Sequence, residues 1–307
     1  MRSPCNSHMN AIETSALCKS YGSREVLHGI DLVVPQASVF GFLGPNGAGK
    51  STTIRILMGL LRASSGTTRV LDRDPWQNGP DLRRRIGYLP GDLSLYPTMR
   101  GRALLMFMMQ ARGEDSTKEM ERLAERFRID LGLRIRACSR GMKQKLGIIQ
   151  ALMHRPDVLI LDEPTTGLDP LMQEVLRDEL QAAAARGQTV LFSSHTLSEV
   201  EQLCDRIAIV RDGNLIEQDT IASLRSRALR RVTMSLDQPI PDFPDAWQPV
   251  ERRDSEHTGV WVGTTDELLH WLSNLRLHDV TISPPDLEDL FMTYYGDEKA
   301  SAVQEAS

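Results

Sequence analysis

A glycine-rich segment near the start of the chain constrains the fold more than any other feature. Residues 44–51 read Gly-Pro-Asn-Gly-Ala-Gly-Lys-Ser, which fits the pattern G-x-x-x-x-G-K-[S/T]. Apolar, β-prone runs at residues 27–34 and 39–43 precede this segment, and a helical pattern at residues 52–61 follows it. The pattern therefore predicts a strand, a phosphate-binding loop and a helix in that order, which is the context that the chemistry of such a loop requires.

The residues of this loop have separate tasks in binding phosphates. Glycines let backbone N–H groups wrap around anionic phosphates at the N-terminus of a helix. Lys50 is expected to reach the β and γ phosphates, and the Ser51 hydroxyl to ligate Mg²⁺. The alternative, an ordinary glycine turn, is less consistent with the strand, loop and helix order. The expected nucleotide-binding residues here are Gly44, Pro45, Asn46, Gly47, Ala48, Gly49, Lys50, Ser51 and Thr52.

Two adjacent carboxylates give the second site signal. Asp162 and Glu163 directly follow the apolar run at residues 158–161, and α/β sheets place their sites at the carboxyl ends of strands. Asp162 is expected to hold the Mg²⁺ shell, and Glu163 to orient or deprotonate the attacking water. A solvated strand end is the alternative, and the phosphate-binding loop upstream favours the catalytic interpretation.

Further apolar runs predict the rest of a sheet and a helical insertion. Continuous runs of this kind are typical of strands buried in a sheet that helices cover on both faces. Residues 90–156 have mainly helical periodicity and are expected to form an insertion in the α/β core. The later strands are expected at residues 158–161, 189–192, 207–210 and 215–218.

A change in composition near residue 225 predicts a domain boundary. An arginine-rich stretch lies at residues 225–231, and such charge runs are usually solvated faces rather than lipid-binding sites. We expect a small α+β domain at residues 226–296, a disordered leader at residues 1–10 and a disordered tail at residues 297–307. The α+β domain is expected to contain strands at residues 232–236, 260–262 and 280–283 and helices at residues 266–272 and 286–295.

Composition excludes several function classes. The chain has 307 residues, enough for one large core and a smaller domain, and its net charge of −5 argues against a dedicated nucleic-acid binder. Its four cysteines lack C-x-x-C spacing, which fits a reducing cytoplasm better than a zinc site or a disulfide framework. No apolar run approaches the roughly 20 residues that a membrane-spanning helix needs.

In this order the motifs resemble those of the ATP-binding subunits of ABC transporters, over residues 11 to about 218. The resemblance implies a P-loop NTPase core with an ABC-type helical subdomain, within an ATP-binding domain at residues 11–225. It also implies ATP and Mg²⁺ as ligands, and ATP hydrolysis with Lys50, Glu163 and His195 as catalytic residues. Tyr21 corresponds to the aromatic residue that stacks on adenine in the family; a buried core tyrosine is the alternative.

Three further residues match family positions that act on ATP bound to another subunit. Residues 138–144 resemble the family's signature segment, usually written LSGGQ, and the match is partial. Ser139 and Gly141 keep a hydroxyl and a glycine N–H at the start of a helix, where both can meet a γ-phosphate. Asp169 belongs to the segment that joins two subunits near the hydrolysis site.

One segment departs from the family's pattern. Where the family carries a glutamine after a strand, this sequence has Gly91 and Asp92. Either Asp92 or water completes the Mg²⁺ shell, or this loop mainly transmits motion to a membrane subunit. The resemblance places a groove for a helix of that subunit at residues 96–112, where the alternative for Met106 to Met109 is the core of the helical insertion.

The resemblance therefore predicts an ATPase that drives export. Two copies, or one copy and a paralogue, would close around ATP and act on a separate transmembrane permease subunit at the cytoplasmic face of the membrane, with no nucleic-acid partner. The exporter assignment follows from the resemblance of the C-terminal region to drug, antibiotic, lipid and polysaccharide exporters. The alternatives are a non-transport ATPase of the same family, in DNA repair, ribosome work or assembly, and a regulator that senses ATP; the intact Glu163 disfavours a pure sensor.

Overall fold

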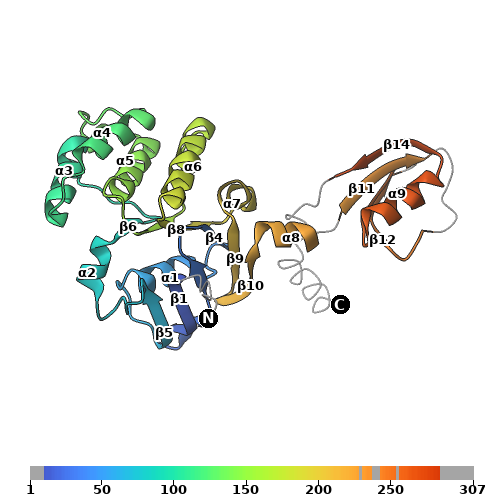
Figure 1. Cartoon of the computed structure of the whole chain (residues 1–307), viewed down its shortest axis with the longest axis horizontal. Helices are drawn as coiled ribbons and strands as arrows, with labels where there is room; N and C mark the ends of the chain where they lie inside the picture. Colours follow the sequence, from blue (N-terminus) through green and yellow to red (C-terminus); the bar gives the residue numbers. More distant parts are fainter. Residues whose placement is uncertain (1–9, 228–229, 237–242, 254–255, 284–307) are drawn as a thin grey trace, which may run out of the picture. The chain divides into compact units, whose positions relative to one another are not determined.

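The chain divides into two compact units, Met1–Thr220 and Ile221–Ser307. The computed structural model describes residues 10–227, 230–236, 243–253 and 256–283, drawn in colour in Figure 1. The division falls at residue 220 rather than at the expected 225, because β10 continues to Thr220 and α8 (Ile221–Arg227) begins directly after it.

A six-stranded sheet forms the centre of the first unit. Its order is β10-β9-β4-β8-β7-β6, and all neighbouring pairs except β10 with β9 are parallel. The strands are β4 (Val39–Leu43), β6 (Ile86–Leu89), β7 (Val158–Asp162), β8 (Thr189–Ser194), β9 (Arg206–Arg211) and β10 (Asn214–Thr220). Every residue of β4, β7 and β8 is buried, which explains their continuous apolar sequences and confirms the strands expected there.

A smaller antiparallel sheet combines three strands that precede the phosphate-binding loop with one that follows it. It contains β1 (Asn10–Tyr21), β2 (Arg24–Ile30), β3 (Val33–Pro35) and β5 (Ser65–Val70), and β1 pairs with the other three. The apolar, β-prone run at residues 27–34 is divided between β2 and β3. The hydroxyl of Thr14 donates to the Ile30 carbonyl and accepts from the Leu32 amide, so the pairing is interrupted between β2 and β3. Asn10 lies in β1 rather than in a leader.

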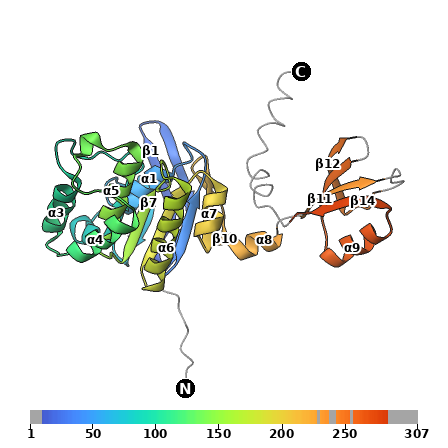
Figure 2. The same ribbon diagram turned by 90° about the horizontal axis from the view of Figure 1, so that it is seen from above.

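Helices flank the central sheet. The helix after the loop, α1 (Lys50–Leu57), ends earlier than the expected residue 61, because Gly59 adopts a φ of 61° that a continuing helix excludes. The regular elements of the insertion are helical, and they gather at one end of this unit in Figures 1 and 2. They are α3 (Gly101–Arg112), α4 (Thr117–Arg126), the short helix Ile135–Ala137 and α5 (Arg140–Leu152).

The remaining helices of the first unit are α2 (Gly79–Arg84), α6 (Pro170–Ala185) and α7 (Leu197–Leu203). None of the helices in the described ranges is both long enough and apolar enough to cross a membrane.

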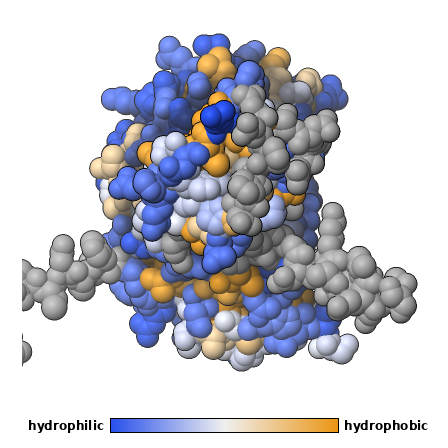
Figure 3. All heavy atoms as spheres, turned by 90° about the vertical axis from the view of Figure 1, so that its right-hand side faces the viewer, coloured by the Kyte–Doolittle hydropathy of each residue, from blue (hydrophilic) through white to orange (hydrophobic). Residues whose placement is uncertain are grey.

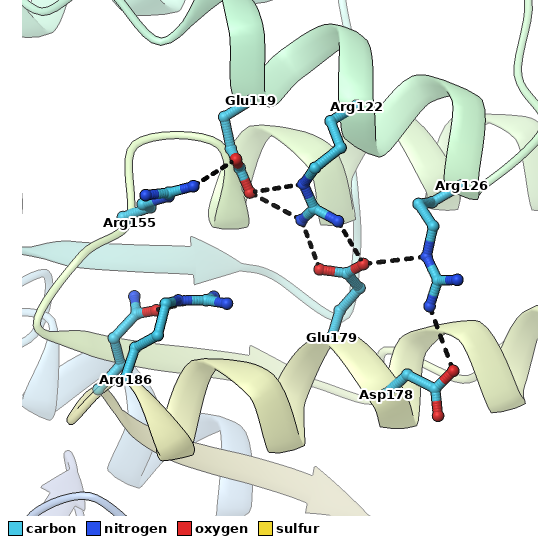
Figure 4. Close-up of polar contacts among 8 residues, drawn as sticks. Glu119, Arg122, Arg126, Arg155, Asp178, Glu179 and Arg186 are labelled. Carbon is cyan, nitrogen blue, oxygen red and sulfur yellow. Dashed lines mark hydrogen bonds and ion pairs between the residues drawn. The ribbon is translucent and has the colours of Figure 1, made fainter.

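Ion pairs join the helical insertion to α6 (Figure 4). Arg122 of α4 donates to both carboxylate oxygens of Glu179 on α6, at 2.8 and 2.6 Å, and Arg126 donates to Glu179 at 3.2 Å. The carboxylate of Glu119 accepts from Arg122 and from Arg155, which follows α5. Helices far apart in sequence are thus held together by charge-assisted hydrogen bonds.

The second unit is a four-stranded antiparallel sheet with helices. The strand order is β12-β13-β11-β14, and α9 (Thr265–Ser273) contributes Leu268 and Leu272 to the core. The strands are β11 (Arg230–Leu236), β12 (Trp247–Arg253), β13 (Glu256–Trp261) and β14 (Leu277–Ile282). Three of these strands and α9 were expected; β12 was not. The expected helix at residues 286–295 and the tail lie outside the described residues.

Aromatic side chains fill the core of the second unit. Trp271 packs against Trp261 with ring centroids 5.3 Å apart and against Trp247 at 5.5 Å.

On the molecular face drawn in Figure 3, hydrophobic residues gather in separate patches among hydrophilic ones.

Candidate active site

The glycine-rich loop connects β4 to α1, as the sequence predicts. The Gly44 amide donates to the Ser194 carbonyl at 3.2 Å, which ties the start of the loop to the end of β8. A Cβ at Gly44 would lie 2.3 Å from the Val210 carbonyl oxygen. Gly49 has a φ of 103°, and a Cβ there would lie 2.5 Å from Leu27. Both positions therefore require glycine, for close packing at Gly44 and for backbone conformation as well at Gly49.

Lys50 folds back over this loop. Its Nζ donates to the carbonyl of Gly44 at 2.6 Å and to that of Pro45 at 3.1 Å. Burial lowers the pKa of Lys50, while the charges of Glu163 and then Asp162 act in the opposite direction. The loop thus holds a partly desolvated ammonium group whose partners are two carbonyl oxygens.

Ser51 and Asp162 come together although they are far apart in the chain. The Ser51 hydroxyl donates to Asp162 Oδ2 at 2.9 Å, and the Ser193 hydroxyl donates to the other carboxylate oxygen. Asp162 is buried at the end of β7. A hydroxyl and a carboxylate at this distance are the hard oxygen donors that Mg²⁺ takes from P-loop proteins, so the pair fits that ion.

Glu163 adopts an unusual backbone conformation directly after β7. Its φ is 50°, in the left-handed region that side chains other than glycine seldom adopt. Its amide donates to the carbonyl and hydroxyl oxygens of Ser193, at 3.1 and 3.2 Å. Its Oε1 lies 3.1 Å from Nδ1 of His195, a half-exposed side chain after β8. The structure thus joins the acidic residue and the histidine that the sequence analysis selected separately.

A cavity of about 520 Å³ adjoins these groups. The loop that lacks the usual glutamine lies against the carboxylates, since a Cβ at Gly91 would be 3.2 Å from Asp162 Oδ2. The lining residues are Ser51, Arg55, Leu60, Tyr88, Pro90, Gly91, Asp92, Asp162 and Glu163.

Ser139, Gly141 and Asp169 form a second group. Ser139 caps the N-terminus of α5 by accepting from the Met142 amide at 3.2 Å, and Asp169 caps α6 in the same way through the Met172 amide. A Cβ at Gly141 would lie 2.5 Å from the carbonyl oxygen of Gly167. None of the hydrogen bonds described for these side chains reaches the phosphate-binding loop of the same chain.

Tyr21 is exposed at the end of β1, with 48% of its surface accessible. The alternative of a buried core tyrosine is therefore wrong. Lys19 Nζ lies 5.1 Å from the centroid of its ring, which leaves Tyr21 as an accessible aromatic surface beside a cation.

Three residues near the site are not among the predicted site residues. Ser193 hydrogen-bonds Asp162 and Glu163, Arg55 lines the cavity, and Gln144 on α5 donates to the backbone behind Glu163. Two of them carry a sequence signal, because Ser193 follows the same predicted strand as His195 and Gln144 lies in the segment at residues 138–144 that resembles the family's signature.

Comparisons with known proteins agree with this geometry. The family described as ABC transporter matches residues 27–166. The daunorubicin/doxorubicin resistance ATP-binding protein DrrA of Streptomyces peucetius is 41% identical over 223 residues, 70% of this chain and 67% of DrrA. The bacitracin transport ATP-binding protein BcrA of Bacillus licheniformis is 37% identical, over 70% of this chain and 72% of BcrA. The uncharacterized ABC transporter ATP-binding protein YhcH of Bacillus subtilis is 32% identical over 94% of this chain and 97% of its own length.

A solved structure described as the ATP-binding subunit of an ABC transporter superposes with a TM-score of 0.66 at 30% identity. The superposition covers 71% of this chain and 92% of the chain in that structure. A nucleotide-free ATP-binding cassette, at 19% identity and a TM-score of 0.59, shares the fold. The expected α/β P-loop core with its helical insertion is thereby confirmed.

Proposed function

The chain belongs to the ABC transporter family as an ATP-binding subunit, and from this premise we propose that it hydrolyses ATP to drive export through a separate membrane-spanning subunit. The observation that carries this proposal is the meeting of the phosphate-binding loop with Ser51, Asp162, Glu163 and His195 at one edge of the central sheet. The similarity to DrrA and BcrA, which are named for resistance and transport, supports export.

The loop residues bind the phosphates of ATP in this proposal. The backbone N–H groups of residues 44–52, Pro45 excepted because proline has none, surround the phosphate oxygens at the N-terminus of α1. Lys50 exchanges its two carbonyl partners for the β and γ phosphates, which are stronger acceptors because they are charged. Tyr21, exposed at the end of β1, stacks on the adenine ring.

Ser51 and Asp162 hold Mg²⁺ with the nucleotide, through the hydroxyl and the carboxylate that are 2.9 Å apart. The ion supplies charge neutralisation for the phosphate oxygens when bound. Ser193 keeps Asp162 oriented by donating to its second oxygen. Asp92 lines the same cavity. This position supports a role for the loop either in completing the Mg²⁺ shell or in transmitting motion to the membrane subunit.

Glu163 and His195 serve hydrolysis. Glu163 orients the attacking water and accepts its proton, and His195, 3.1 Å from that carboxylate, hydrogen-bonds the γ-phosphate. Conversion of His195 to alanine is expected to abolish turnover while ATP binding remains. An alanine variant that still hydrolyses ATP would remove His195 from the mechanism.

A complete site requires a second ATP-binding subunit, either another copy or a paralogue. Ser139 and Gly141, at the N-terminus of α5, and Asp169, at that of α6, act on the ATP bound to the loop of the partner. The Ser139 hydroxyl accepts from the Met142 amide and keeps its own proton free for a phosphate oxygen.

Residues 96–112 are the proposed docking surface for the membrane subunit. Tyr96, Met106 and Phe107 are exposed large apolar side chains there, whereas Met109 is buried. Met106 and Phe107 expose apolar surface on α3, and such surface is typical of a site where another protein docks. The subunit would thus lie at the cytoplasmic face of the membrane, with the first unit, which ends at Thr220, as the ATP-binding domain and the second unit, which begins at Ile221, as an accessory domain.

The alternative of a non-transport ATPase is not favoured, because relatives such as BcrA, DrrA and LnrL are named for transport and resistance.

The test of the proposed nucleotide sandwich is the oligomeric state of Glu163→Gln, measured by size exclusion with ATP and Mg²⁺. We expect a stable dimer with ATP and a monomer without it. The control Glu163→Gln/Ser139→Arg should remain monomeric. A Glu163→Gln protein that binds ATP tightly and stays monomeric contradicts the proposed sandwich.

A further inference from the structure

Gln144 is a buried polar residue that the proposed chemistry does not use. It lies on α5, one turn after Ser139 and Gly141, and its accessible surface is 8%. Its Nε2 lies 3.2 Å from the carbonyl oxygen of Glu163 and 3.0 Å from that of Pro164. Because both neighbours are acceptors, only the donor end of the amide can face them.

These bonds act on a backbone segment that is already constrained. Glu163 has a φ of 50°, a left-handed conformation that is unfavourable for a residue with a side chain. Its amide is held by Ser193, and its carbonyl accepts from the Thr166 amide and from Gln144. Of these hydrogen bonds to the backbone of Glu163, the one donated by Gln144 comes from the helical insertion. The bonds with Ser193 and Thr166 come from the core sheet and from the loop itself.

A second contact joins the same two segments. The carbonyl oxygen of Gly167 would lie 2.5 Å from a Cβ at Gly141, so α5 and the segment after Glu163 pack without space for a side chain. The first two turns of α5 therefore contact residues 163–167 at two places, through the hydrogen bonds of Gln144 and through the packing of Gly141 against Gly167. A small movement of this helix must move the backbone that carries Glu163.

We propose that Gln144 is a positioning residue that couples the two ATP sites of the dimer. It ties the helix whose N-terminus acts on the partner's ATP to the backbone of the catalytic Glu163 in the same chain. Binding of ATP at the partner's site thus positions the Glu163 carboxylate for hydrolysis of the ATP at the chain's own site. This inference rests on the proposed nucleotide sandwich and adds the residue that connects its halves.

The test replaces Gln144 by glutamate and by leucine in the full chain. The carboxylate of Gln144→Glu faces two carbonyl oxygens, and Gln144→Leu keeps a similar size without a donor. We expect kcat to fall about tenfold or more in both variants, with the Kd for ATP within about twofold of wild type, because the phosphate-binding loop is untouched. We also expect the Hill coefficient for ATP to fall towards one. Gln150→Glu, on the same helix, is the matched control and should keep wild-type kinetics.

A pH profile separates positioning from general damage. A protonated carboxylic acid donates again, so the deficit of Gln144→Glu should narrow as pH falls from about 8 to about 6, whereas that of Gln144→Leu should not. Thermal melts identify a variant that fails to fold, and the other variant then decides. Wild-type kcat and Hill coefficient in a folded variant overturn the coupling role.

The two proposals fail in different ways. If Glu163→Gln dimerises with ATP while Gln144→Leu hydrolyses ATP like wild type, only the coupling role is wrong. If Glu163→Gln never dimerises, the sandwich itself fails, and with it the coupling role.

Discussion

Glu179 offers a quantitative test of how the helical insertion is held to the core. Its side chain is 5% exposed and accepts three hydrogen bonds from Arg122 and Arg126, whose side chains are 41% and 44% exposed. Loss of one partner costs about 3–5 kcal/mol in a fully buried pair and about 0–1 kcal/mol in an exposed pair. Because the carboxylate is buried while both guanidinium groups reach water, Glu179→Gln should cost roughly 2 kcal/mol.

The assay is urea denaturation, in which the unfolding transition of the first unit is monitored. With about 2–4 °C of melting temperature for each kcal/mol in a unit of this size, Glu179→Gln should also melt roughly 4–8 °C lower. Asp178→Asn is the matched control, since Asp178 is the adjacent residue, is 55% exposed and pairs with Arg126. Its cost should stay below about 0.5 kcal/mol. Combination with Arg122→Met should be strongly non-additive.

The same carboxylate predicts a pH dependence. Burial would raise the pKa of Glu179, but the hydrogen bonds and charges of Arg122 and then Arg126 outweigh it and lower the pKa overall. The stabilisation is therefore present above the unfolded pKa, about 4.3, and is lost as pH falls through the lower folded value. Equal stability losses for Glu179→Gln and Asp178→Asn, or additivity with Arg122→Met, would refute the reasoning.

Three further predictions concern other parts of the first unit. Gly49→Ala should weaken ATP binding at least tenfold, measured with a fluorescent nucleotide, because its φ of 103° and the contact with Leu27 leave no room for a Cβ. Burial lowers the pKa of His154 to about 4, so stability should fall by at most about 3 kcal/mol between pH 6.5 and 4 as the unfolded chain takes up the proton. Urea titrations should show this slope in wild type and lose it in His154→Met. Tyr21→Ala should weaken ATP binding by about 1–3 kcal/mol, with Tyr21→Phe close to wild type in the same titration; equal affinities for all three would exclude stacking.

The sequence predicted those elements whose signals are local. Residues 44–51 carry their conformation in their own glycines, and the apolar runs of β4, β7 and β8 are continuous because both faces of the sheet are buried. Asp162 and Glu163 could be selected because strand ends in such sheets carry sites. The helical insertion was recognisable by its period, since residues three and four apart on a helix share a face.

Other features depended on contacts between distant segments. β1 escaped prediction because its pairing shifts register between Leu17 and Cys18 and again between Lys19 and Ser20, which disturbs the alternation that identifies a strand. The break between β2 and β3 arises from a hydroxyl of Thr14 on the neighbouring strand.

The site shows the same division between sequence and fold. The residue types of the phosphate-binding loop and the two carboxylates were determined by the sequence alone, because phosphates and Mg²⁺ demand particular donors at short spacing. The bond between Ser51 and Asp162, the two serine oxygens that hold the Glu163 amide, and the reach of Gln144 to the backbone behind it were decided only by the tertiary structure. A hydrogen bond requires its two atoms within about 3 Å, and only the packing of helices on the sheet brings residues so far apart in the chain to that distance.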